Sequence, residues 1–304
     1  MKRRPPEQRD LPDTPLDLAR AAARFMAERG IDNARLEAEL LLASVLDLNR
    51  LDLYLQHDRP LTEEEKEAFR AVVRRRLRRE PLQYIVGEVQ FRELNLRVDP
   101  RVLIPRPETE VLVGAVLEWA ESAAAENPAR GLTAVDVGTG SGAIALSLAL
   151  EGPFERVVAT DVSADALAVA EDNARRCGLD ERVEFRHGEL WAPLGDEERF
   201  DVVVSNPPYV AEADRAALEP EVVAWEPESA LFAPGAGLDI IFGLVDGAPD
   251  HLRSDGLLAL EIGLGQAEAV VERIERRGAY RTWRVVKDLA DRDRVVLAEF
   301  ASVA

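Results

Sequence analysis

The sequence is poor in cysteine and contains no long apolar run. Its 304 residues include a single cysteine, Cys177, so no disulfide can form within the chain, which fits a reducing compartment. No histidine lies near Cys177, and we interpret it as a packing residue. No apolar stretch approaches the roughly 18 residues that span a bilayer, and the charged segment 1–13 lacks the apolar run of a secretory signal. We therefore expect a soluble, cytoplasmic protein without a membrane partner.

Positive charge is also scarce. The 38 lysines and arginines face 57 aspartates and glutamates, which gives a formal net charge of −19. Because such a chain repels a phosphate backbone, sequence-independent nucleic-acid binding is disfavoured. The exception is a basic run at residues 74–79, which continues a stripe made by Arg70, Arg74 and Arg78. A solvated helix face and a contact surface for RNA or an acidic partner both explain this stripe.

The N-terminal part of the chain carries helical patterns only. Apolar residues recur at helical spacing, so we predict helices over residues 14–30, 33–46 and 62–80. The expected inward residues are Leu18, Ala22 and Phe25 in the first, Leu36, Leu40 and Ala43 in the second, and Phe69, Val73 and Leu77 in the third. Residues 1–84 are therefore predicted to form a small helical domain, which contains none of the motifs that follow.

Residues 85–304 show a different pattern. Short alternating runs around Gly87 predict a β-hairpin, and the proline-rich stretch before Glu108 leads into a helix. Strands and helices then alternate, with strands predicted at residues 133–138, 156–161, 182–188, 201–206, 256–263, 281–288 and 293–300. This alternation indicates an α/β domain with a mostly parallel sheet, helices on both faces, and two antiparallel strands at the end of the chain. Ligands of such sheets bind outside the carboxyl ends of the strands.

The stretch "AVDVGTGSGAIALSLAL" joins a strand to a helix through a glycine-rich turn. Its glycines permit positive φ and a close approach of a ligand, and the helix N-terminus offers free N–H groups. Asp161 ends the next strand, where its carboxylate can accept both hydroxyls of a ribose. Gly138, Gly140 and Ala143 also satisfy G-x-G-x-x-G/A, so a dinucleotide-dependent oxidoreductase and a purely structural turn stay open. Asp136 favours a nucleoside that carries positive charge, since its carboxylate repels a pyrophosphate.

A second motif ends the strand at 201–206, where the chain continues as Asn206, Pro207, Pro208 and Tyr209. Neither proline has an N–H, so this tip presents carbonyl oxygens, and the Asn206 side chain adds another acceptor. Such a tip suits a substrate with an –NH₂ group, whose two hydrogens it can hold. Tyr209 adds a ring face for a flat group or a methyl cation. A strand end with a simple Asn-Pro turn is the structural alternative.

Together, "DVGTGSGAIAL", Asp161 and "NPPY" resemble the class I S-adenosylmethionine-dependent methyltransferases that modify adenine N6, cytosine N4 or the glutamine amide. The stretches "EPLQYIVGEVQF", "LIPRPETE" and "LALEIGLGQ" extend the resemblance to the release factor glutamine methyltransferase (PrmC/HemK) family over residues 14–300. The resemblance implies a Rossmann-like sheet, S-adenosyl-L-methionine as cofactor, and the Gly-Gly-Gln glutamine of class 1 peptide chain release factors as substrate. A nucleic-acid methyltransferase shares the motif, but the net charge and the lack of a target-recognition insert disfavour it.

The family's site residues carry over to matching positions. The implied cofactor-binding residues are Gly138, Thr139, Gly140, Ser141, Gly142, Asp161, Glu189, Leu190 and Asn206; the implied substrate-binding residues are Asn206, Pro207, Pro208 and Tyr209, with Asn206, Pro207 and Tyr209 as catalytic residues. No metal site is implied. Two positions depart from the family pattern: Glu189 replaces a usual aspartate near the adenine amino group, and Ala236 interrupts a usual "DGLD". The helical domain 1–84 is implied to dock the substrate, and 85–304 to carry the hairpin and the methyltransferase fold.

Overall fold

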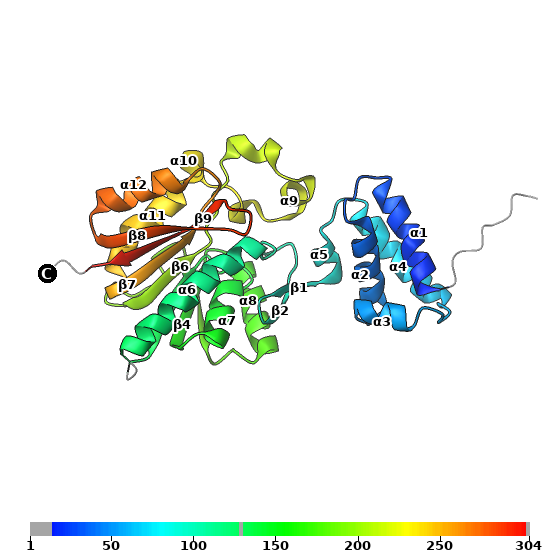
Figure 1. Cartoon of the computed structure of the whole chain (residues 1–304), viewed down its shortest axis with the longest axis horizontal. Helices are drawn as coiled ribbons and strands as arrows, with labels where there is room; N and C mark the ends of the chain where they lie inside the picture. Colours follow the sequence, from blue (N-terminus) through cyan, green and yellow to red (C-terminus); the bar gives the residue numbers. More distant parts are fainter. Residues whose placement is uncertain (1–13, 128–129, 302–304) are drawn as a thin grey trace, which may run out of the picture. The chain divides into compact units, whose positions relative to one another are not determined.

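The computed structural model describes residues 14–127 and 130–301. Contacts between residues divide the chain into two compact units, one that extends to Gly87 and one that begins at Glu88 (Figure 1). The first unit is helical, and the second contains a seven-stranded sheet. Among the described residues, no helix is both long enough and apolar enough to cross a membrane.

The helical unit contains α1 (Pro15–Ala27), α2 (Ala34–Leu46), α3 (Arg50–Leu55), α4 (Glu63–Arg76) and α5 (Leu82–Val86). A capping box starts α4: the Thr62 hydroxyl accepts from the Glu65 N–H at 3.2 Å, and the Glu65 carboxylate accepts from the Thr62 N–H at 2.8 Å. The helices α3 and α5 were not predicted. They have six and five residues, too few for a hydrophobic period to show.

The expected inward residues are correct in α4 and partly wrong in α1 and α2. Phe69 and Val73 of α4 are buried as predicted. In α1, however, Phe25 is 44% exposed and its ring lies under the Arg29 guanidinium, and in α2 Leu36 is 41% exposed. Leu18 and Ala43 are buried as predicted. The rest of this core comes from neighbouring alanine, leucine and methionine positions, namely Ala19, Ala23, Met26, Ala38, Leu41 and Leu42. These helices carry apolar residues on more than one face, so spacing alone does not choose the buried face.

The arginine run at the end of α4 bonds within the helical unit. The ion pairs are Arg75 with Glu80, Arg76 with Glu37, and both Arg70 and Arg74 with Glu67. The Arg76–Glu37 pair links α4 to α2 at 2.5 Å, and both of its side chains are largely buried. Much of the run therefore has a structural role, although Arg74 and Arg78 are exposed.

The sheet-containing unit begins with a hairpin of β1 (Glu88–Phe91) and β2 (Leu94–Arg97), which pair antiparallel. The predicted hairpin is therefore present, but residues 84–86, which were expected to belong to it, are helical and lie in α5. Gly87 ends α5 with a φ of +88°, a conformation in which glycine has no steric penalty. The helix after the proline-rich stretch is α6 (Pro107–Glu126), with its proline in the first turn.

The large sheet has the strand order β5-β4-β3-β6-β7-β9-β8. Its strands are β3 (Leu132–Val137), β4 (Phe154–Asp161), β5 (Val183–His187), β6 (Phe200–Ser205), β7 (Leu252–Glu261), β8 (Tyr280–Lys287) and β9 (Asp293–Phe300). The first five strands in this order pair parallel, and β9 is antiparallel to both β7 and β8. The chain order reverses between β3 and β6, so a crevice is expected where their carboxyl ends diverge.

Helices cover both faces of this sheet (Figure 1). The helices α6, α7 (Ala143–Glu151) and α8 (Ala164–Cys177) share a core with one face, and α11 (Asp239–Gly247) and α12 (Ala267–Arg277) share a core with the other. Successive strand residues alternate between the two cores, as Val202 and Val203 of β6 do. This confirms the predicted α/β class with a mostly parallel sheet and an antiparallel last strand.

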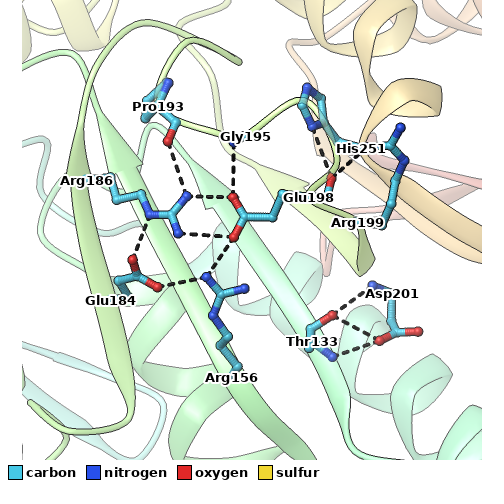
Figure 2. A network of polar contacts seen from close by, with 10 residues as sticks. All are labelled: Thr133, Arg156, Glu184, Arg186, Pro193, Gly195, Glu198, Arg199, Asp201 and His251. Carbon is cyan, nitrogen blue, oxygen red and sulfur yellow. Dashed lines mark hydrogen bonds and ion pairs between the residues drawn. The ribbon is translucent and has the colours of Figure 1, made fainter.

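An ion-pair network joins β4, β5 and the turn before β6 (Figure 2). Glu198 accepts from Arg186 at 2.6 Å and from Arg156 at 2.7 Å, and Glu184 bonds both arginines. The hydrogen bonds from Arg186 lower the pKa of Glu198 to about 2, against the opposing effect of burial. These charges are partly exposed and satisfied by one another, which is the arrangement of a structural network.

Candidate functional site

The loops after β3, β4, β5 and β6 meet around one pocket at the carboxyl edge of the sheet. The predicted site residues that line it are Gly138, Thr139, Gly140, Ser141, Asp161, Glu189, Leu190, Asn206, Pro207 and Pro208. Gly142 and Tyr209 are not among the lining residues. Residues from four separate sequence segments thus lie together, at the carboxyl ends of the strands.

The glycine loop between β3 and α7 takes a conformation that glycine favours. Gly138 and Gly140 have φ of +78° and +56°, and a Cβ placed on either would meet no atom within 4 Å. The backbone there borders open space, which a ligand can approach closely. Gly142 differs, because a Cβ on it would lie 3.1 Å from Leu146. It therefore serves the packing at the start of α7, and a direct contact of Gly142 with the cofactor stays a prediction.

Asp136 lies beneath the glycine loop and does not line the pocket. One carboxylate oxygen accepts from the Thr139 hydroxyl at 2.6 Å and from the Ala145 N–H in the first turn of α7 at 3.2 Å. The other oxygen is buried and has no hydrogen-bond partner among the described residues. Burial raises the pKa of Asp136 to about 7. The expected contact with a positive charge is therefore not direct; the carboxylate holds the loop from below and places a titratable negative charge behind it.

Asp161 ties the glycine loop to the end of β4. Its carboxylate oxygens accept from the Gly140 N–H and from the Ser163 N–H, each at 2.8 Å. Each oxygen keeps a second lone pair, so the carboxylate can also accept a pair of hydroxyls. Asp161 lines the pocket beside the open space over Gly140. This donor and acceptor set fits the ribose of a nucleoside.

The loop after β5 brings Glu189 and Leu190 to the same pocket. Glu189 is exposed, so its carboxylate is free to turn toward a bound amino group. Leu190 has a φ of +46°, a left-handed conformation that costs a residue with a Cβ about 1–2 kcal/mol. Such strain is retained where the surroundings require it, and here it places the Leu190 side chain against the core under the pocket.

The Asn-Pro-Pro-Tyr tip is held from several sides. The Ser205 hydroxyl donates to the Val137 carbonyl at 2.6 Å, which joins the end of β6 to the end of β3. The Asn206 Nδ2 donates to the Thr109 hydroxyl at 3.1 Å. Tyr209 turns toward the core, where its hydroxyl donates to Glu261 at 3.2 Å. Its predicted contact with the substrate stays a prediction, whereas its anchoring role is visible.

Two polar residues behind this tip were not singled out from the sequence. Thr109 of α6 and Glu261 at the end of β7 are 3% and 1% exposed, and the Thr109 hydroxyl donates to the Glu261 carboxylate at 2.7 Å. Burial raises the pKa of Glu261 to about 7. Both lie in stretches that carried the family resemblance, "PRPETE" and "LALEIG". A buried polar residue inside a strand pattern was the available signal, although it did not indicate a partner.

The outer wall of the pocket comes from residues 101–105 and from the long connection between β6 and β7. Glu226 fastens these segments together: its buried carboxylate accepts from the Ile104 N–H at 3.2 Å and pairs with Arg106. In the same connection Gly237 approaches the Tyr209 carbonyl so closely that a Cβ would lie 2.1 Å from it. The connection is therefore held against the site at two points, Glu226 and Gly237.

Similarity to known proteins agrees with this geometry. A release factor glutamine methyltransferase of Geobacter sulfurreducens is 46% identical over 254 residues, which cover 84% of this chain and 86% of the relative. That of Chlorobaculum tepidum is 47% identical over 250 residues, 81% of this chain and 84% of the relative. The chain belongs to the release factor glutamine methyltransferase family. Family models for the PrmC N-terminal domain and the methyltransferase small domain match residues 17–87 and 123–226.

Family membership confirms the resemblance drawn from the sequence, and it identifies an S-adenosylmethionine-dependent methyltransferase rather than a dinucleotide-dependent oxidoreductase. Solved structures support the fold alone. The hMettl16 catalytic domain in complex with MAT2A 3'UTR hairpin 1 is 18% identical, with a TM-score of 0.54 over 80% of this chain and 82% of that one. The open space over the glycine loop and the spare lone pairs of Asp161 fit the nucleoside of S-adenosylmethionine.

Proposed function

We propose that this protein methylates the side-chain amide nitrogen of the glutamine in the Gly-Gly-Gln motif of class 1 peptide chain release factors. The observation that carries this is the orientation of Asn206. Its Nδ2 donates to Thr109, which leaves Oδ1 for the pocket that the residue lines. The adjoining Pro207 contributes a carbonyl and no N–H. Two acceptors side by side suit the two hydrogens of a primary amide.

The chemical difficulty is that an amide nitrogen is a poor nucleophile, since its lone pair is delocalised into its own carbonyl. S-adenosylmethionine, when bound, supplies an electrophilic methyl group on a sulfonium. Asn206 and the Pro207 carbonyl hold both hydrogens, aim the nitrogen and favour its pyramidal form as positive charge develops. Orientation and electrostatic stabilisation therefore provide most of the rate, and the proton leaves to solvent late in the reaction.

The cofactor side of the pocket is built by the chain's own backbone and two aspartates. Asp161 would accept the ribose hydroxyls and keep the glycine loop in place. Asp136 supports the same loop through Thr139 and adds negative charge behind it. Glu189 and Leu190 would border the adenine. These roles are proposals for this chain, and variants at each position test them separately.

The helical unit is proposed to dock the release factor. Glutamines are common on protein surfaces, so selecting one needs a second contact surface, because specificity is a difference of affinities. The stripe formed by Arg70, Arg74 and Arg78 is the candidate face, although Glu67 offsets part of its charge through ion pairs with the first two. We expect no nucleic-acid substrate and no membrane partner. The proposed substrate also places the enzyme in the cytoplasm, where translation ends.

Methyl transfer from labelled S-adenosylmethionine tests the substrate class. The enzyme is incubated with a purified class 1 release factor, with the same factor carrying alanine for the Gly-Gly-Gln glutamine, and with total nucleic acid. We expect label in the first factor only. Label in the alanine factor would move the modification to another residue, and label in nucleic acid would favour an adenine or cytosine methyltransferase.

The docking proposal is tested in the full chain by the double variant Arg74→Gln/Arg78→Gln. We expect a higher KM for the full-length factor and an unchanged rate on a short Gly-Gly-Gln peptide, because the peptide does not reach the docking surface. Arg20→Gln, which removes an exposed arginine of α1, is the matched control. An unchanged KM for the full-length factor would show that this stripe is not the docking surface.

A further inference from the structure

We propose that Thr109 and Glu261 are positioning residues that determine which atom of the Asn206 amide faces the acceptor, and that they thereby make the site select an amide over a carboxylate. The inference rests on the proposed function, since it concerns how the same pocket recognises glutamine. It is carried by a buried chain of hydrogen bonds, from Asn206 to Thr109 and from Thr109 to Glu261.

The direction of this chain follows from the donors and acceptors available. An ionised glutamate only accepts, so the Thr109 hydroxyl, 2.7 Å from it, must donate its one hydrogen there. The Thr109 oxygen can then only accept from Asn206, which obliges the asparagine to turn Nδ2 toward it. The remaining amide atom, Oδ1, is the one left for the substrate. An asparagine without this constraint presents either atom, because its two ends have nearly the same shape.

The Glu261 end of this series of hydrogen bonds is satisfied as well. The second Glu261 oxygen accepts from the Tyr209 hydroxyl, so both carboxylate oxygens have donors. Thr109 and Glu261 are buried, and solvent exchange does not easily replace either bond. The four residues come from α6, β7 and the tip after β6, so the chain also joins these three segments. A fully satisfied buried network of this kind specifies a single arrangement.

The consequence for specificity is a matter of matching hydrogen-bond partners. With Oδ1 and the Pro207 carbonyl toward the pocket, a glutamine –NH₂ finds two acceptors. A glutamate in its place would bring oxygen lone pairs against these oxygens and leave buried acceptors unpaired. Sites that pair polar groups reject such mismatched analogues strongly. If the Asn206 amide were rotated by 180°, its –NH₂ would face the pocket and donate to a carboxylate instead.

Protonation of Glu261 would remove the constraint, because a carboxylic acid can donate to Thr109. The charged and titratable groups that act on Glu261 are Arg294 of β9, Glu108 of α6 and Tyr209. Burial nevertheless dominates and raises the pKa of Glu261 to about 7, with Arg294 opposing. As pH falls below about 7, the acid form grows and the orientation of Asn206 is released. Turnover at saturating cofactor should therefore decline on the acid side.

The test compares Thr109→Val, which keeps the shape and removes the hydroxyl, with Thr109→Ser, which keeps the hydroxyl. For Thr109→Val we expect kcat/KM on the release factor to fall about tenfold or more, with the Kd of S-adenosylmethionine unchanged. A factor with Gly-Gly-Glu, used as a competitor, should bind wild type far more weakly than the unmodified factor. The difference in affinity between the two factors should be smaller in Thr109→Val and return to its wild-type size in Thr109→Ser. Equal rates and equal competition in the Val and Ser variants would overturn the proposal.

Glu261→Gln supplies a second, independent readout, since glutamine has the same shape but can donate or accept. We expect the acid-side decline of kcat between about pH 8 and 6 to flatten in this variant. An identical pH profile in wild type and Glu261→Gln would assign the decline to another group and contradict the role of Glu261. Failure of the proposed function gives a different result, because wild type itself would then leave the Gly-Gly-Gln glutamine unmethylated.

Discussion

Glu198 and Glu261 are both hydrogen-bonded glutamates, yet their pKa values move in opposite directions. Hydrogen bonds from Arg186 lower the pKa of Glu198 to about 2 in the ion-pair network of Figure 2. Burial raises the pKa of Glu261 to about 7 behind the Asn206 tip. The first is held by guanidinium groups, whereas the second is held by the hydroxyls of Thr109 and Tyr209.

This difference separates structural carboxylates from those of the site. Asp136 follows Glu261: it is fully buried, its bonded partners are a hydroxyl and a backbone N–H, and its pKa is raised to about 7. Carboxylates with strongly raised pKa values gather at functional sites. A cation paired directly with such a carboxylate would lower its pKa and keep it ionised. Glu226 is intermediate, because burial raises its pKa although Arg106 pairs with it. It fastens the wall of the pocket without reaching the tip.

Removing the acceptor at the tip should give the largest effect. Asn206→Ala removes the side-chain oxygen that accepts from the substrate –NH₂. We therefore expect turnover on the release factor to fall about 100-fold or more, while the cofactor Kd is retained. Steady-state kinetics and calorimetry measure the two quantities. Asn95→Ala, at an exposed position of β2, is the matched control. Normal turnover in Asn206→Ala, with the protein folded, would show that Asn206 does not hold the substrate amide.

Removing the strand-end carboxylate should act on the cofactor instead. Asp161→Ala loses the acceptor for the ribose and the tie to Gly140, so we expect S-adenosylmethionine affinity to fall roughly tenfold or more. Calorimetric titration measures it, with Asp180→Ala, an exposed aspartate, as control. An unchanged Kd would show that the ribose contact lies elsewhere.

The raised pKa of Asp136 predicts a pH-dependent stability. Between about pH 4 and 7 the folded protein keeps a proton that the unfolded chain has released, so this carboxyl destabilises the fold increasingly as pH rises through that range. Asn does not titrate. The Tm of Asp136→Asn minus that of wild type should therefore be larger at pH 8 than at pH 5, by about 2–4 °C for each kcal/mol of carboxyl destabilisation removed. A difference that is equal at the two pH values would show that Asp136 ionises normally.

The ion-pair network should give the smallest effect. Its contribution to stability should depend on pH in the direction opposite to that of Asp136. Glu198 has a lowered pKa, so its contribution is present above about pH 4.5 and is lost as pH falls toward 2. We expect Glu198→Gln to lose on the order of 1 kcal/mol at pH 7 and less at pH 3, as urea unfolding would show. Its kcat and cofactor Kd should equal those of wild type. A clear loss of activity would remove the distinction between the two sets of carboxylates.

The sequence predicted those parts of the site that are local. A strand, a glycine turn and a helix, or a strand that ends in Asn206 and two prolines, are recognisable within a few residues, and parallel strands then bring their ends together. Glu189 and Leu190 were placed at the pocket by the family resemblance alone. The fold class followed from the alternation of strands and helices, which is a regular pattern over the whole second unit.

The parts that were missed depend on distant partners. Thr109 and Glu261 are 152 positions apart and meet only because α6 packs beside β7. Nothing local shows that the Tyr209 ring turns toward Glu261 rather than into the pocket. In the helical unit, Phe25 was expected inside but is exposed. When a helix carries apolar residues on several faces, tertiary packing decides which face is buried. Hydrogen-bond direction and helix rotation are thus properties of the folded chain.

The position of the methyl group on a release factor methylated by this enzyme tests the proposed reaction directly. Fragmentation mass spectrometry of the peptide containing Gly-Gly-Gln, after reaction with isotope-labelled S-adenosylmethionine, locates that group. We expect one labelled methyl on the side-chain amide nitrogen of the glutamine, formed by wild type and strongly reduced with Asn206→Ala. A methyl on a backbone, carboxylate or other side-chain atom, or an equal yield from Asn206→Ala, would contradict it.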